Sequence, residues 1–271
     1  MTPIEARRIL RTIGLRPQQA AGQNFLLEER IAESMVDAAG IKDGQPVLEI
    51  GPGLGILTRA LLHHGAKVIA VELDTRLYAY MKQAFKGQTR LRLINNDIFK
   101  VNLSELFKEG EYALVANLPY SATSLVFRNF LTLSPRPSSM TVMIQRDVAK
   151  RITARPGAMS LLALTVQHYC RPTCLFDVPP SSFFPAPKVT SSVVHGHDLR
   201  PVNPDFDRAL FRLMRAGFSS RRKQLHNTIA ATRRLESEVV IQHLASIGLP
   251  ATVRPQELSL ENWLSMAKKF S

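Results

Sequence analysis

Residues 46–55 read Pro-Val-Leu-Glu-Ile-Gly-Pro-Gly-Leu-Gly. The first five residues form a short apolar run typical of a buried strand, and the glycines after it let the backbone turn tightly beside a ligand. Their spacing is G-x-G-x-G, whereas the nicotinamide fingerprint G-x-G-x-x-G would need glycine at position 56, where this chain has Ile56. The stretch therefore predicts a strand followed by a ligand-binding turn, with Glu49 two residues before the first glycine.

Strand-like and helix-like segments alternate around this stretch. The pattern predicts strands over 46–50, 67–72, 90–94, 112–116 and 140–145, and helices over 56–64, 75–85, 125–133 and 161–168. Two late strands over 173–178 and 191–195, joined by a loop rich in proline and aromatic residues, would add an antiparallel pair. Strands separated by helices indicate the α/β class with a parallel, doubly wound, Rossmann-like sheet.

After residue 200 the pattern becomes purely helical. We expect helices over 205–215, 221–231, 237–247 and 259–270, with Asp205, Ser237 and Ser259 as N-caps. A chain of 271 residues is near the upper limit for one hydrophobic core. We therefore predict a larger domain over 1–200, which begins with a basic arm over 1–22, and a small all-α domain over 201–271.

The composition excludes several classes of protein. Apolar residues make up 45% of the chain and charged residues 21%, which is ordinary for a globular enzyme and wrong for a disordered chain. No window approaches the roughly 18 apolar residues of a membrane span. Two cysteines, Cys170 and Cys174, form no disulfide framework, which fits a reducing compartment. We interpret them as plain apolar side chains and expect no metal site.

The charge balance points to an anionic partner. Thirty-five Lys and Arg against 22 Asp and Glu give a net charge of +13, which favours nucleic acid first and an anionic membrane surface second. The charge is concentrated near both ends of the chain: Arg7, Arg8, Arg11 and Arg16 at the start, and Arg208, Arg212, Arg215, Arg221, Arg222, Lys223, Arg233 and Arg234 in the helical part. The plainer interpretation of each run is a solvated helix face. An Arg-rich start also resembles a transit peptide slightly, but we favour a native basic arm.

Acidic side chains follow the second and third predicted strands. Glu72 ends the second strand, where a carboxylate can accept hydrogen bonds from a ribose diol, and Asp97 follows the third, where a side chain can reach an adenine amino group. Each acid alone could be a solvated strand-end residue, but together they predict an adenosyl ligand. Glu49 would repel a pyrophosphate and tolerate a sulfonium cation, which favours S-adenosylmethionine, unless Glu49 is structural.

The fourth predicted strand runs into Asn117-Leu118-Pro119-Tyr120. Taken alone, an Asn beside a proline can be turn chemistry. At this place in the sheet, however, the tetrapeptide resembles the motif of amino-methyltransferases that act on adenine in nucleic acid. Four further segments, at 22–26, 51–53, 179–189 and 217–227, extend the resemblance in order over essentially the whole chain.

Together these motifs resemble the KsgA/RsmA family of small-subunit (16S) rRNA adenine dimethyltransferases. The related Erm enzymes, which dimethylate large-subunit rRNA and confer macrolide resistance, typically carry Gly-Lys-Gly in the first turn and N-I-P-Y in the motif. Leu54 and Leu118 in this chain favour the KsgA/RsmA branch. A third alternative is an assembly factor that binds immature small subunits, with catalysis secondary.

The resemblance implies S-adenosylmethionine-dependent dimethylation of N6 on two adjacent adenosines near the 3′ end of small-subunit rRNA, with a role in subunit biogenesis. It carries the cofactor contacts over to six residues: Asn24, Leu26, Gly51, Glu72, Asp97 and Asn117. It makes 1–200 the catalytic domain and 201–271 the rRNA-binding domain, with Arg221, Arg222 and Lys223 on phosphates. It further implies a monomer without a metal or a membrane association in the bacterial cytoplasm, with an organelle as the alternative.

The implied target site comprises Asn117, Leu118, Pro119, Tyr120 and Phe183. The Asn117 side chain and the Leu118 carbonyl would accept hydrogen bonds from the adenine amino group, and no general base is expected. Tyr120 and Phe183 would stack on a base that has left its helix; the alternatives for Phe183 are core packing and a pocket lined by its neighbour Phe184.

The chain departs from the family pattern in two places. A shortened segment over 156–160 stands where relatives usually have a Tyr-Gly pair, which leaves the loop geometry near the site open. The tetrapeptide over 121–124 reads Ser-Ala-Thr-Ser where an Asn-Ile pair is common, which could alter the rate or the ratio of mono- to dimethylated product.

Overall fold

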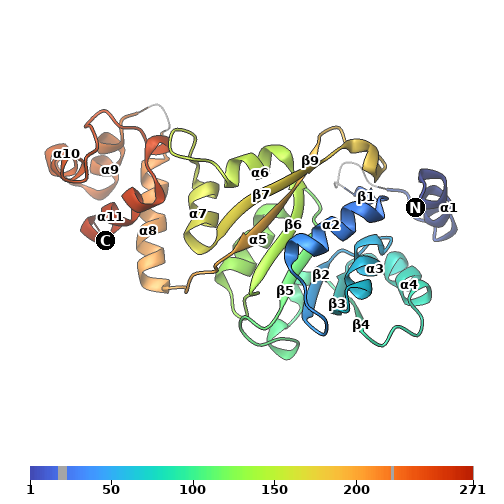
Figure 1. Ribbon diagram of the computed structural model, residues 1–271. Helices are drawn as coiled ribbons and strands as arrows, with labels where there is room; N and C mark the ends of the chain where they lie inside the picture. Colours follow the sequence, from blue (N-terminus) through green and yellow to red (C-terminus); the bar gives the residue numbers. More distant parts are fainter. Residues whose placement is uncertain (18–22, 221–222, 271) are drawn as a thin grey trace. The chain divides into compact units, whose positions relative to one another are not determined.

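Over residues 1–17, 23–220 and 223–270, which the computed structural model describes, the main element is a seven-stranded sheet (Figure 1). Its strands are β2 (Pro46–Ile50), β3 (Lys67–Glu72), β4 (Leu91–Asn95), β5 (Ala113–Asn117), β6 (Ser139–Gln145), β7 (Arg171–Val178) and β9 (Ser191–His197). They lie in the order β4-β3-β2-β5-β6-β9-β7, with parallel pairing from β4 to β6 and β9 antiparallel to β6. The predicted parallel sheet with late additional strands is confirmed.

The parallel register brings the ends of four strands to one edge of the sheet. Ile50 of β2 pairs with Val71 of β3, and Glu72 pairs with Asn95 at the end of β4. β5 ends at Asn117, one residue later than predicted. Ligands of doubly wound sheets bind at this carboxyl edge, which is where the predicted site residues lie.

Helices connect the parallel strands as the sequence pattern indicated. They are α3 (Ile56–His63), α4 (Thr75–Ala84) and α5 (Thr123–Thr132). The helix α6 (Arg146–Ile152), which was not predicted, follows the last parallel strand, β6. α4 begins directly after β3 because the Asp74 side chain accepts hydrogen bonds from the backbone amides of Arg76 and Leu77.

Two helices precede the sheet and were not predicted. They are α1 (Pro3–Thr12) and α2 (Glu29–Ala39). α1 starts with a capping box between Thr2 and Glu5, and its buried side chains belong to a small core with Leu54 and Leu77. The predicted basic arm is therefore helical over part of its length and packs beside the glycine-rich turn.

A separate two-stranded ladder joins distant parts of the chain. β1 (Phe25–Leu26) pairs antiparallel with β8 (Phe183–Phe184), so that Leu26 lies opposite Phe183. The ladder is extended by the Leu27 amide, which donates to the Ser182 carbonyl, and by the Ser182 hydroxyl, which donates to Glu28. It places two predicted site residues, Leu26 and Phe183, side by side.

The C-terminal helices form a compact group with one earlier helix. They are α7 (Leu161–Tyr169), α8 (Pro204–Gly217), α9 (Leu225–Arg233), α10 (Ser237–Ser246) and α11 (Leu260–Phe270). Their apolar faces share one core that includes Leu164, Leu210 and the fully buried Trp263. Figure 1 shows α8, α9, α10 and α11 gathered together.

The starts of these helices correct some predicted caps. Pro204 occupies the first position of α8, so Asn203 and not Asp205 is its N-cap. α10 is preceded by Glu236, with Ser237 as its first residue. Ser259 caps α11 as predicted, since its hydroxyl accepts from the Asn262 amide.

α9 begins at Leu225 and not at 221, because the Leu225 amide donates to the Val253 carbonyl outside the helix. Lys223 therefore precedes the helix.

The chain divides into two compact units, and the division is not a single boundary near residue 200. The first unit contains 1–149 and 172–199, and the second contains 150–171 and 200–271. The second unit includes α7 because Met159, Ala163 and Leu164 pack into the C-terminal core. A local helical pattern over 161–168 carries no information about which core the helix joins.

No helix within the described ranges is long and apolar enough to cross a membrane. Cys170 is buried, as expected for an apolar side chain, whereas Cys174 is exposed on β7.

Candidate active site

The glycine-rich turn after β2 is closed by backbone conformations that favour glycine. Gly51, Gly53 and Gly55 all have positive φ angles, of 64°, 58° and 80°. A Cβ on Gly55 would lie 2.5 Å from the Phe85 ring. Phe85 therefore packs closely against the turn, which holds the backbone of the turn in place.

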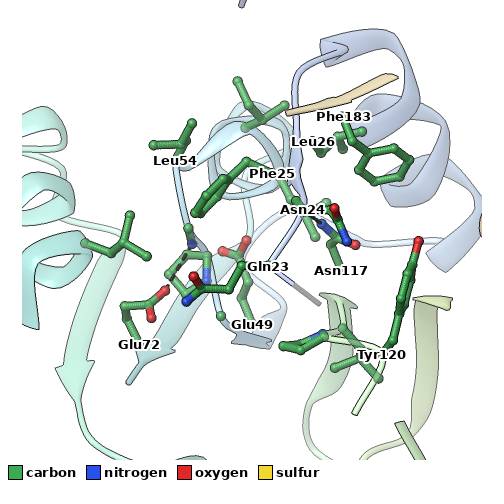
Figure 2. A pocket seen from close by; sticks show the side chains of 18 residues that line it. Gln23, Asn24, Phe25, Leu26, Glu49, Leu54, Glu72, Asn117, Tyr120 and Phe183 are labelled. Carbon is green, nitrogen blue, oxygen red and sulfur yellow. Dashed lines mark hydrogen bonds between the residues drawn. The ribbon is translucent and has the colours of Figure 1, made fainter. Parts of the chain in front are cut away.

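A pocket opens at the carboxyl edge of the sheet, and all five residues predicted for the target site line it (Figure 2). Five of the six predicted cofactor residues line it too: Asn24, Leu26, Gly51, Glu72 and Asn117. In the view of Figure 2, Glu72 lies on one side and Tyr120 and Phe183 on the other, with Asn117 between them. The structure thus brings together residues from positions 24 to 183.

The sixth predicted cofactor residue lies in an adjoining pocket. Asp97 follows β4 and caps a short 3-10 helix (Ile98–Lys100), where its carboxylate accepts from the Phe99 amide at 3.1 Å. This adjoining pocket shares Gly51, Glu72 and Pro119 with the first. The two pockets therefore adjoin, and in the strand order Asp97 after β4 and Asn117 at the end of β5 lie on opposite sides of Glu72 on β3.

Glu72 holds the walls of the site together. One carboxylate oxygen accepts from the Gly53 amide at 3.1 Å, and the other accepts from the Asp74 amide at 3.0 Å. The side chain is nearly buried, and burial raises its pKa while the backbone hydrogen bonds oppose that shift. Glu72 therefore ties the glycine-rich turn to the end of β3.

Glu49 is a buried acid beneath the same pocket. Its carboxyl group accepts a hydrogen bond of 2.6 Å from the Thr58 hydroxyl, and 1% of the residue is exposed. Burial raises its pKa to about 8, the Thr58 hydrogen bond opposes this, and the charge of Glu72 adds to the rise. The prediction from sequence treated Glu49 as a charged residue, whereas its burial in the structure favours the protonated form.

The ionisation of Glu49 predicts a pH-dependent stability. The folded state binds its proton up to about pH 8, whereas the unfolded chain releases it near pH 4.5, so the contribution of Glu49 to stability falls as the pH rises between these values. Glu49→Gln has no such titration. We expect its free energy of unfolding, relative to wild type, to be at least about 1 kcal/mol higher at about pH 9 than at about pH 5.

Urea unfolding at both pH values measures this difference. Glu33→Gln, which changes an exposed acid on α2 in the same way, is the control and should leave it near zero. If the free energy of unfolding of Glu49→Gln relative to wild type were the same at both pH values, the assigned ionisation would be contradicted.

Asn117 is held in one orientation at the centre of the pocket. Its side-chain Nδ2 donates to the backbone carbonyl of Asn24 at 3.2 Å. Since this bond commits the nitrogen of the amide, Oδ1 is the atom that can accept a hydrogen bond from a ligand. The site therefore presents an oriented acceptor beside two aromatic rings.

The two rings are fixed by contacts outside the pocket. The Tyr120 hydroxyl lies 3.0 Å from the hydroxyl of the buried Ser191 on β9, and Phe183 is held by the β1–β8 ladder. Phe184, in contrast, packs in the core with α1, and the Arg7 guanidinium lies over its ring at 5.5 Å. Phe183, and not Phe184, therefore faces the pocket.

Several lining residues were missed from the sequence. Phe25 and Leu77 line the first pocket, and Leu73 and Phe99 line the second with 70% and 38% of their surfaces exposed. The position of Leu73, an apolar residue directly after a predicted strand, is a signal in the sequence that could have indicated a contact with a ligand.

Other predicted residues are not part of these pockets. Arg221 and Arg222 lie outside the described residues, as does Gly22 of the first motif, and Lys223 is exposed in the second unit. The shortened segment over 156–160 also belongs to the second unit, where Gly157 and Met159 donate backbone hydrogen bonds to Gln256. It lines neither pocket.

Comparisons with known proteins identify the family. Residues 15–271 match the family model of ribosomal RNA adenine dimethylase. Ribosomal RNA small subunit methyltransferase A of Dehalococcoides mccartyi is 36% identical over 98% of this chain and 93% of its own length. A dimethyladenosine transferase from Plasmodium falciparum has a TM-score of 0.75 at 25% identity, covering 91% of this chain and 97% of that one.

The 23S rRNA methyltransferase ErmE has the same fold, with a TM-score of 0.74 at 22% identity over 91% of this chain and 99% of its own. Because both structures match the fold equally well, the backbone does not separate the two branches that the sequence motifs distinguish. The match of the family model over nearly the whole length, together with the curated relative, shows that this chain belongs to the ribosomal RNA adenine dimethylase family.

Proposed function

We propose that this protein uses S-adenosylmethionine to dimethylate N6 of two adjacent adenosines near the 3′ end of small-subunit rRNA. The observation that carries the proposal is the single pocket in which Asn117 and the rings of Tyr120 and Phe183 face Glu49 and Glu72. The relative from Dehalococcoides mccartyi, which is named for the small subunit, supports this substrate over large-subunit rRNA.

The residues of the site fit the methyl donor that the family uses. Glu72, at the end of β3, would hold the ribose hydroxyls, and Asp97 in the adjoining pocket would accept from the adenine amino group. The exposed side chains of Leu73 and Phe99 offer apolar contacts for the faces of the adenine ring. When bound, S-adenosylmethionine supplies an electrophilic methyl group.

The remaining cofactor contacts surround the glycine-rich turn. We assign them to Asn24, Leu26, Gly51 and Asn117, which line the first pocket with Glu72. Gly51 has a positive φ, which favours glycine, and because glycine has no side chain the ligand can approach the backbone here.

Asn117 and Leu118 would make the target nitrogen reactive. The exocyclic nitrogen of adenine is a weak nucleophile because its lone pair is delocalised into the ring. Acceptors at Asn117 Oδ1 and the Leu118 carbonyl would bind its N–H groups and favour a more tetrahedral nitrogen. Positioning supplies much of the rate, and the proton leaves after transfer, when the nitrogen is more acidic, so no residue acts as a general base.

Tyr120 and Phe183 would hold the target base after it leaves its stack. Stacking on an aromatic side chain contributes about 1–3 kcal/mol per base. Pro119 lies between Asn117 and Tyr120 and lines both pockets. The motif thus places the hydrogen-bond acceptors and one stacking surface within four consecutive residues.

Basic side chains outside the pocket would bind the rRNA backbone. We assign phosphate contacts to Arg221, Arg222 and Lys223, and we include the exposed arginines of α1 because that helix packs against the core of the catalytic unit. RNA helices are recognised largely by shape and backbone, so an immature small subunit is the proposed substrate. We place the protein as a monomer in the bacterial cytoplasm, where that particle is assembled.

Reversing Arg221, Arg222 and Lys223 to glutamate should weaken binding to small subunits by at least about tenfold at physiological salt. Each lost phosphate contact should also lower the slope of log K against log salt by roughly 0.7–0.9. Filter binding of labelled subunits over a salt series measures both quantities. The matched control reverses three exposed lysines elsewhere on the chain: Lys82, Lys86 and Lys108. Equal losses for the two triple variants would show a general charge effect and contradict this assignment.

A further inference from the structure

Glu49 is an acid in a pocket where no described lining residue is a cation. Of the described residues that line this pocket, the titratable ones are Glu49, Glu72 and Tyr120, and none is basic. Burying a carboxylate without a positive partner is costly, and the site meets that cost by keeping the proton on Glu49. A ligand that brings a positive charge into the pocket would stabilise the ionised form of Glu49 and so favour loss of this proton.

The described groups that face Glu49 are neutral or acidic, so a positive charge beside it would come from a ligand. On the side of β3 it faces Glu72, whose carboxylate is bound by the Gly53 and Asp74 amides. On the side of α3 it faces the neutral hydroxyl of Thr58. The segment after β5 contributes the neutral amide of Asn117 and the phenol of Tyr120, and the segment before β1 contributes the amide of Asn24.

The position of Glu49 suits the reacting end of the methyl donor. Figure 2 shows Glu49 between Glu72, proposed to bind the ribose, and Asn117, proposed to bind the target nitrogen. The methyl group must lie between these two, in line with the nitrogen. The donor carries a sulfonium cation there, whereas the product S-adenosylhomocysteine carries a neutral sulfide.

We propose that Glu49 is the residue that distinguishes donor from product: it releases its proton to solvent when the cationic donor is bound and keeps it in the empty or product-bound pocket. This inference rests on the proposed placement of the cofactor. The resulting ion pair forms with the donor alone, so the donor gains affinity over the product. After methyl transfer the product has no sulfonium charge, and the Glu49 carboxylate takes up a proton from solvent. No ion pair then holds the product in the pocket.

The ratio of the two dissociation constants tests this directly. Calorimetry with S-adenosylmethionine and S-adenosylhomocysteine should give a product-to-donor Kd ratio that rises with pH and levels off above about pH 8. If the donor lowers the pKa of Glu49 by one unit, the ratio should rise by about eightfold from pH 6 to pH 9, and a larger lowering should give a larger rise. Both ligands carry the same ribose, adenine, amino and carboxyl groups, so contributions from Glu72 and from the ligand termini largely cancel.

Two variants locate the effect. Glu49→Gln keeps the size of the side chain and its acceptor for Thr58 but cannot ionise, so its ratio should be smaller and nearly independent of pH. Glu33→Gln, on the exposed side of α2, should behave as wild type. A wild-type ratio that does not change with pH, or an equal rise in Glu49→Gln, would overturn the proposal.

A measurement on the wild type alone guards against misfolding of the variant. Calorimetry at about pH 7 in two buffers of different ionisation enthalpy counts the protons released on binding. Donor binding should release more protons than product binding, and equal release would overturn the proposal. If neither ligand bound at all, the placement of the cofactor would fail first, which distinguishes that outcome from a failure of Glu49 alone.

Discussion

Replacing Asn117 with alanine is expected to lower kcat for methyl transfer by about 10²–10³, because the oriented acceptor for the target amino group is lost. The structure explains why Asn is needed: its Nδ2 is bound by the Asn24 carbonyl, so Oδ1 is the atom left for the substrate. Alanine removes the acceptor and leaves the Asn24 carbonyl without this donor. Since Asn117 also lines the cofactor part of the pocket, a smaller loss of cofactor affinity should accompany the loss of rate.

Single-turnover methylation of small subunits at saturating cofactor separates these two effects. Binding of the variant to small subunits should remain within about threefold of wild type, because the phosphate contacts are elsewhere. Asn129→Ala, an asparagine on α5 whose side chain bonds within its own helix, is the control and should retain its rate. Full methylation by Asn117→Ala would contradict the assignment of the acceptor. Lost methylation with retained subunit binding would also show that the binding role is separable from catalysis.

Replacing Glu72 with alanine should raise the Kd of S-adenosylmethionine by about 30- to 150-fold, which corresponds to about 2–3 kcal/mol for lost hydrogen bonds to a charged group. The carboxylate is proposed to bind the ribose hydroxyls, and it also holds the amides of Gly53 and Asp74. Its removal therefore loosens the turn as well as removing a ligand contact. Both consequences act on the part of the cofactor that donor and product share.

The expected pattern for Glu72→Ala thus differs from that for Glu49→Gln. Calorimetry should show large losses for both donor and product, whereas the change at Glu49 acts mainly on the ratio between them. Glu33→Ala should change neither dissociation constant, since Glu33 is exposed on α2. A Glu72→Ala protein that binds both ligands with wild-type affinity would contradict the placement of the ribose.

The parallel sheet could be predicted because its signals are local. The apolar run over 46–50 matches β2 to the residue, and the run over 67–72 matches β3. Acids and amides directly after such strands must meet at one edge, so the meeting of Glu72 and Asn117 follows from topology alone.

The β1–β8 ladder could not be predicted because its strands are two residues long and more than 150 positions apart. No periodicity can be read from Phe25–Leu26 or Phe183–Phe184, and their pairing is determined by tertiary packing. For the same reason the sequence left open which phenylalanine faces the pocket. In the structure, Phe184 packs with α1 and Phe183 lines the pocket.

The ionisation of Glu49 and the domain of α7 were predicted wrongly for the same reason: both depend on tertiary contacts. The sequence shows that Glu49 is acidic, but its ionisation depends on burial and on the nearby Glu72. The helix α7 was placed with the sheet because it is near it in the chain, whereas its apolar side chains complete the C-terminal core. Both properties depend on contacts between residues that are distant in the sequence.

The most direct test of the proposed function is transfer of radiolabelled methyl groups from S-adenosylmethionine to unmethylated small subunits. Large subunits and naked rRNA are assayed in parallel, and the products are identified by nucleoside analysis. We predict N6,N6-dimethyladenosine in the rRNA of the small subunit alone. Label in large-subunit rRNA would contradict this account in favour of a resistance-type methylase, and no label in any substrate would contradict catalysis and leave subunit binding as the primary role.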